Sequence, residues 1–175
     1  MLAYLVLGSW QYSRALDTAS HWLTQQNIAA ERLTVRPTIS NLWLWRVLYK
    51  DIATQRWQTQ ALYLPYWSSK AAIKKGGSAA IYSNTTQAGT QTHQDVERFN
   101  FFSDGYLSKH YRPDGSFYIG DIRYGLTPES AQPLWGIELT DDTKNHVIRH
   151  RSLRGKMNWD RVTGLLKGDG FKPVQ

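Results

Sequence analysis

Residues 41–49 carry the strongest hydrophobic pattern in the chain, with apolar side chains at most positions and one arginine among them. Successive side chains of a β-strand point to opposite faces, so Leu44 and Arg46 fall on one face while Trp45 and Val47 fall on the other. Because both faces are largely apolar, we expect both to be covered. An unpaired buried charge is strongly destabilising, so Arg46 requires an acidic or carbonyl partner and is either structural or part of a site.

The other patterned segments predict an α+β fold. Strands are expected at residues 33–36, 42–50, 56–64, 106–111, 117–124 and 134–140, and helices at 10–27, 92–104 and 158–167. Residues 70–89 contain adjacent glycines and a polar run, which predicts an exposed connection around one short strand at 79–82. We therefore predict an antiparallel sheet of about five or six strands, packed with N-terminal, central and C-terminal helices. It forms one domain over residues 9–170, followed by a tail at 171–175.

Cap and turn residues mark several of these boundaries. Thr92 is expected to be the N-cap of the central helix, and Gly105 and Gly168 are natural stops for the central and C-terminal helices. The sequence RPDGS at residues 112–116 predicts a hairpin turn. Proline presets one turn residue there, and glycine supplies a left-handed one.

The N-terminus is apolar but short. Residues 1–8 cannot span a bilayer and have no preceding basic residues of the kind a signal peptide has. We expect them to be either the stub of a membrane helix or a segment that packs on the core. The predicted helix at 10–27 suits a helix that leaves a membrane surface, or one that simply packs on a sheet. Trp10 and Tyr12 fit the aromatic belt of a membrane interface.

Composition narrows the classes of function without selecting one. Aromatic residues make up 13% of the chain, which indicates a packed globular body rather than disorder. The formal net charge of +7 permits binding to nucleic acid, anionic lipid or phosphorylated substrates. The absence of cysteine excludes disulfides, thiolate metal sites and a cysteine nucleophile.

Two arginine-containing motifs carry a resemblance to a known family. The first is RPT at residues 36–38, followed by Asn41 and by LWR at 44–46, and the second is GDIRYG at 120–125. In order and approximate spacing they resemble the C-terminal soluble region of the YdjM-like family of membrane-bound metal-dependent hydrolases, across residues 20–168. Ile39 departs from the family pattern, which often has a second proline there. The resemblance implies a binding or structural motif made of Asn41, Trp45, Arg46, Asp121 and Arg123.

The resemblance also implies a function and a location. In that family the metal-binding histidines belong to an N-terminal membrane region. The chain is accordingly expected to be a soluble accessory domain of a metal-dependent hydrolase in the bacterial inner membrane, which positions substrate or partner near a membrane-embedded active site outside this chain. On this expectation the chain is not catalytic alone and holds no cofactor, although a divalent metal is possible in the full-length context. Its partners are the membrane surface, anionic lipid or its own N-terminal membrane region.

Metal-binding chemistry within the chain itself is sparse. His146 and His150 have the i, i+4 spacing that chelates zinc from a helix, with Asp141 and Asp142 nearby. The surrounding cations would repel a dication, and no apolar periodicity marks a helix there. A basic solvated loop is therefore favoured over a metal site. The chain has neither a nucleophile elbow nor a phosphate-binding loop.

The basic stretch at residues 144–167 has three possible roles. Its cations include Lys144, Arg149, Arg151, Arg154 and Lys156. A solvated face is the simplest interpretation. Beside a bilayer, the same charges would contact anionic headgroups. In a stand-alone binding module for nucleic acid or other polyanions, they would contact phosphates while aromatic residues stack on bases. No recognised nucleic-acid motif supports this last role.

Asp121 lies beside apolar neighbours on the predicted strand at 117–124. A buried carboxylate needs a cationic or hydrogen-bonding partner. We therefore expect Asp121 to pair with Arg46 or Arg123, in a structural or a functional role.

Overall fold

The computed structural model describes residues 2–38, 41–140, 147–151 and 159–174. The chain divides into two compact units. Unit 1 comprises residues 1–78, 127–131 and 156–175, and unit 2 comprises residues 79–126 and 132–155. Each unit is described separately below, and the expectation of one domain over residues 9–170 stays a prediction.

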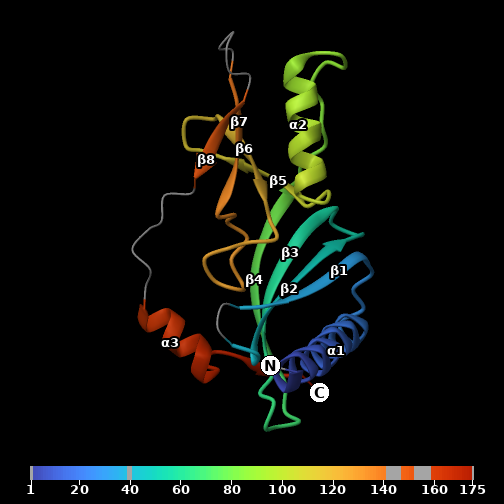
Figure 1. Cartoon of the computed structure of the whole chain (residues 1–175), viewed down its shortest axis with the longest axis vertical. Coiled ribbons are helices and arrows are strands. Elements are labelled where there is room, and N and C mark those ends of the chain that lie inside the picture. Colours follow the sequence, from blue (N-terminus) through green and yellow to red (C-terminus); the bar gives the residue numbers. More distant parts are fainter. Residues whose placement is uncertain (1, 39–40, 141–146, 152–158, 175) are drawn as a thin grey trace. The chain divides into compact units, whose positions relative to one another are not determined.

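Unit 1 is built on antiparallel strands with two helices (Figure 1). Its elements are α1 (Leu2–Gln25), β1 (Ala30–Pro37), β2 (Leu44–Asp51), β3 (Arg56–Tyr63), most of β4 (Ala72–Ile81), α3 (Trp159–Lys167) and β9 (Lys172–Pro173). The strands are ordered β1, β2, β3, β4, and β9 pairs with β4.

Strand β2 is covered on both faces, as its pattern predicts. Trp45 and Val47 pack in one cluster with Ala19 of α1, which lies along these strands in Figure 1. On the opposite face, Leu44 packs in a second cluster with Leu165 of α3. The continuous burial of β2 follows from its position between α1 on one side and α3 on the other.

Unit 2 is built on the end of β4 and a set of short antiparallel strands. Its further elements are α2 (Gln91–Phe102), β5 (Leu107–Tyr111), β6 (Phe117–Asp121), β7 (Trp135–Leu139) and β8 (Val147–Arg151). The order is β4, β5, β6, β7, β8. Val96 of α2 packs against Leu107 and Ile119. The predicted β5–β6 hairpin is confirmed, with the backbone N–H of Arg112 donating to the carbonyl of Ser116 at 2.8 Å.

The α+β class is confirmed, whereas the strand number and two helix starts are corrected. The described residues form nine strands, more than the five or six predicted. The N-terminal helix begins at Leu2 rather than at residue 10. The central helix is capped by Thr90 rather than Thr92, because the Thr90 side chain accepts a hydrogen bond from the backbone N–H of His93.

The largest correction concerns β4, which was expected to be mostly an exposed connection. Glycine weakens a strand, so Gly76 and Gly77 suggested a loop. In the structure another backbone segment approaches them closely. A Cβ atom on Gly76 would lie 2.1 Å from the carbonyl oxygen of Glu129, and the backbone N–H of Gly77 donates to that same oxygen at 2.8 Å. The two glycines therefore permit backbone contact within a continuous strand.

Strand β8 is a second correction. Residues 147–151 pair antiparallel with β7, so this part of the basic stretch is a strand and not a solvated loop. The sequence did not indicate this strand, because three of its five residues are arginine or histidine and the apolar pattern of a strand is weak there.

Candidate functional site

Arg46 holds a loop of unit 1 through backbone carbonyls. Its Nη1 donates to the carbonyl oxygens of Thr127, Pro128 and Ser130, at 3.2, 2.7 and 2.8 Å. The residue is 5% exposed. The predicted need of the buried Arg46 for an acidic or carbonyl partner is therefore met by three backbone carbonyls. We name residues 127–131 the clamped loop.

Thr59 of β3 fastens the clamped loop on the same side of the sheet. Its hydroxyl donates to the carbonyl of Glu129 at 2.7 Å, and it accepts from the backbone N–H of Gly77 at 3.2 Å. The side chain is fully buried. Sequence reasoning missed Thr59, although a hydroxyl beside apolar strand positions was a signal for a buried hydrogen bond.

Asn41 and Trp45 fix the chain where it enters β2. The side-chain oxygen Oδ1 of Asn41 accepts from the backbone N–H groups of Trp43 and Leu44, at 3.2 and 2.8 Å. The Trp45 indole donates to the carbonyl of Leu42 at 3.0 Å. These local bonds orient the first residues of β2. Asn41, Trp45 and Arg46 are thus brought together in unit 1 by contacts that hold the unit together.

Asp121 pairs with Arg123, one of its two expected partners, within unit 2. The Arg123 Nε donates to Oδ1 at 2.9 Å and Nη2 donates to Oδ2 at 2.7 Å, which makes the pair bidentate. The indole of Trp135 also donates to Oδ2, at 3.1 Å. Asp121 is fully buried, and its hydrogen bond raises the pKa of Arg123 above the ordinary value, which keeps the guanidinium charged.

The predicted basic surface and metal candidates are only partly within the described residues. Arg149, Arg151 and His150 lie on β8, where the backbone of His150 is paired with Gly136. His146, Lys144, Arg154 and Lys156 lie outside the described residues. His150 therefore lies on a strand rather than on the helix that the i, i+4 chelate would require. Among the described residues, no group of three or more potential ligand side chains gathers to hold a metal ion.

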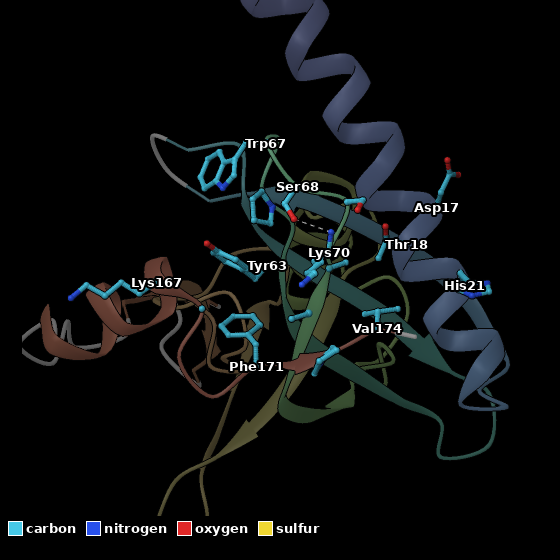
Figure 2. Close-up of a pocket in the computed structure, with 16 residues that line it drawn as sticks. Asp17, Thr18, His21, Tyr63, Trp67, Ser68, Lys70, Lys167, Phe171 and Val174 are labelled. Atoms are coloured by element: carbon cyan, nitrogen blue, oxygen red, sulfur yellow. Dashed lines mark hydrogen bonds between the residues drawn. The ribbon is translucent and has the colours of Figure 1, made fainter.

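A pocket of about 990 Å³ lies in unit 1 (Figure 2). Its lining comes from α1, the loop after β3, the end of α3 and β9, and includes Thr18, His21, Tyr63, Lys70, Lys167 and Phe171. Sequence reasoning missed this pocket, because its walls come from segments distant in sequence and no motif marks them.

The pocket has an aromatic wall and a fixed loop. The rings of Tyr63 and Phe171 lie 5.8 Å apart between centroids. Arg14 of α1 donates to the carbonyl of Ser68 at 2.9 Å, and Gln11 donates to the carbonyl of Leu64 at 2.6 Å. These two bonds join α1 to the loop after β3. Hydrogen bonds therefore hold one side of the pocket, formed by α1 and the loop after β3, in place.

Two lysines give the pocket its positive charge. Lys70 and Lys167 are exposed, and neither ammonium makes an ion pair in the part of the chain that the structure describes. In Figure 2, Lys70 lies between α1 and the aromatic wall, whereas Lys167 extends outward from α3. Asp17 also lines the pocket, but its carboxylate points away from Lys70 in this view. The pocket thus combines aromatic surface with an exposed cation that has no ion-pair partner among the described residues.

The chain matches no protein-family model, and no curated protein or solved structure matches it. The resemblance to the YdjM-like family therefore stays a prediction. None of the helices within the described residues is both long enough and apolar enough to cross a membrane.

Proposed function

We propose that this chain is an accessory domain that docks on an anionic membrane surface through the first turns of α1. There it holds substrate or partner for a metal-dependent hydrolase whose active site lies outside this chain. The observation that carries the proposal is the division of α1 into two parts. Ala15 and Ala19 in its second part are fully buried, whereas Leu5, Val6 and Trp10 in its first part are 57, 64 and 47% exposed.

Exposed apolar residues on a helix are suited to the boundary between headgroups and acyl chains. Burying a Leu, Val or Trp side chain contributes roughly 1.5 to 3 kcal/mol, so three such residues supply weak, reversible attachment. Arg14 lies over the ring of Trp10, 4.7 Å from its centroid, which places a cation beside the apolar turns. Anionic lipid would add roughly 1 kcal/mol for each basic residue near the surface. The two arginine motifs, at residues 36–46 and 120–125, also support the proposal, because their order resembles that in the YdjM-like family.

Cosedimentation with vesicles tests the docking. We expect the intact chain to bind vesicles that contain anionic lipid at low salt, and to be released as salt screens the charges. The triple variant Leu5→Glu, Val6→Glu, Trp10→Glu should bind at least tenfold more weakly while its melting temperature is retained.

The matched control is Ile52→Glu, since Ile52 lies at the β2–β3 turn of the same unit and is 48% exposed. This variant should bind vesicles as the unmodified chain does. If the unmodified chain ignores anionic vesicles at low salt, or if the triple variant and Ile52→Glu bind equally, the docking proposal fails.

A second function, polyanion binding, is favoured by the β5–β6 hairpin of unit 2. The ammonium of Lys109 lies 4.1 Å from the ring centroid of Phe117 and 4.9 Å from that of Tyr111, which is 67% exposed. An exposed aromatic ring beside a cation is suited to stacking on a nucleic-acid base. Retention on single-stranded DNA that is lost in Tyr111→Ala, together with no vesicle binding, would select this function over membrane docking.

A further inference from the structure

We infer that the pocket beside α1 binds one anionic lipid, with its charged headgroup at Lys70 and its apolar part against Tyr63 and Phe171. The inference rests on the proposed membrane function for the source of the ligand, but the pocket is tested without a membrane. Two features of unit 1 support the inference. One is the chemistry of the pocket, and the other is a single face of α1 that extends from the exposed apolar turns to the pocket.

The pocket chemistry calls for a ligand with two parts. The aromatic wall of Tyr63 and Phe171 would make no favourable polar contact with a free phosphate, which would be held only by flexible, solvated lysines. A neutral apolar ligand would make no use of the two lysines beside that wall. An anionic amphiphile satisfies both surfaces, and the volume of about 990 Å³ lies at the upper end of the usual range for ligand pockets.

One face of α1 joins the pocket to the exposed apolar turns. Val6, Trp10, Ser13, Asp17 and His21 are separated by four, three, four and four positions, so they share one side of the helix. The first three line a shallow apolar hollow on α1 and the last two line the pocket. From Trp10 to His21 the helix rises roughly 16 Å, about half the thickness of a bilayer core.

This continuity gives the lipid a path. A lipid that enters at the first turns of α1 would follow the small side chain of Ser13 and reach Thr18, which projects toward Lys70 in Figure 2. The hydrogen bonds of Arg14 and Gln11 keep the opposite wall in place along this path. Ser13 of the hollow and Asp17 of the pocket lie about one helical turn apart, so the two surfaces adjoin on α1.

The test uses a short-chain lipid that stays monomeric, so that no bilayer is required. Dihexanoyl phosphatidic acid below its critical micelle concentration should bind the intact chain in isothermal titration calorimetry. Dihexanoyl phosphatidylcholine, whose headgroup carries no net charge, should bind at least fivefold more weakly. Inorganic phosphate should give no measurable heat. Equal affinity for phosphate and phosphatidic acid would overturn the inference.

Three variants locate the site. Lys70→Gln should weaken binding of the phosphatidic acid at least fivefold, and Thr18→Trp should block it by filling the pocket. The matched control is Lys75→Gln, because Lys75 is an exposed lysine of β4 that does not line the pocket. Since Lys70 is exposed, its replacement leaves the fold intact even if Thr18→Trp does not fold. Equal weakening in Lys70→Gln and Lys75→Gln would refute the site.

Failure of the pocket and failure of docking give different results. A chain that cosediments with vesicles but binds no monomeric phosphatidic acid keeps the docking function and loses the lipid site. A chain that binds the monomer in the pocket but ignores vesicles keeps the site and loses the docking function.

Discussion

The Asp121–Arg123 pair allows a sharp prediction about the stability of unit 2. Asp121→Asn preserves the size of the side chain and replaces one carboxylate oxygen with an NH2 group. If that group takes the place of Oδ2, it faces two donors, Arg123 Nη2 and the indole of Trp135. Two hydrogen bonds to a charged acceptor are then lost. The opposite amide orientation loses the two bonds to Oδ1, from the backbone N–H and Nε of Arg123.

The expected loss follows from burial. Hydrogen bonds to charged groups contribute roughly 1.5 to 3 kcal/mol each, so two give about 3 to 6 kcal/mol. Breaking a buried pair costs roughly 3 to 5 kcal/mol. Arg123 is 11% exposed and also donates to the carbonyl of Phe102 at 2.8 Å, which favours the lower end. We expect a loss of about 3 kcal/mol in unfolding free energy, or roughly 6 to 12 °C in melting temperature.

Urea and thermal unfolding of the two proteins measure this loss directly. The matched control is Asp95→Asn on α2, whose partner Arg98 is 75% exposed at a distance of 3.0 Å. Because the Arg98 side chain is largely in solvent, this pair contributes little, and the control should change stability by less than about 1 kcal/mol. If Asp121→Asn destabilises no more than Asp95→Asn does, the bidentate pair is not a stabilising contact and our reasoning is wrong.

Two further predictions concern a close approach and alkaline pH. Gly76→Ala should destabilise the protein by roughly 1 to 3 kcal/mol, because its Cβ would overlap the carbonyl of Glu129. The control Gly8→Ala in α1 meets no atom within 4 Å and should stabilise by up to about 1 kcal/mol. Equal effects of the two substitutions on urea unfolding would exclude the overlap. Burial raises the pKa of Tyr49 above its ordinary 10.0. The unfolded chain therefore loses this proton first, so stability is complete below about pH 10 and falls as pH rises toward the folded pKa. Tyr49→Phe should flatten that fall between about pH 9 and pH 11 in urea unfolding, and an unchanged slope would contradict the assignment.

The elements that could be predicted are those in which local pattern and tertiary packing agree. The apolar residues on both faces of β2 indicated that both faces are covered, and Trp45 and Leu44 do pack with different helices. The β5–β6 hairpin followed from its turn residues, with Gly115 at a φ of +84°. The pairing of Asp121 was predictable because Arg123 is two residues away and shares its environment.

The features that escaped prediction depend on contacts distant in sequence. The sequence around Gly76 contains no signal for the close approach of Glu129, so the local propensity of the glycines indicated a loop. The partners of Arg46 are backbone carbonyls, which every residue possesses and no sequence pattern marks. The pocket likewise arises only when α1, the loop after β3 and the end of the chain meet.

The clamped loop has a consequence for how the protein is made. Unit 1 is assembled from three separate stretches of chain, and the carbonyls that receive Arg46 lie 81 to 84 residues after it. At a synthesis rate of roughly 5 to 20 residues per second, the interval between Arg46 and these partners lasts about 4 to 17 s. Throughout that interval the Arg46 face of β2 lacks the clamped loop, and α3, which packs on Leu44 of the same face, is made later still. An unfinished chain therefore exposes this face to misassociation and to chaperone binding.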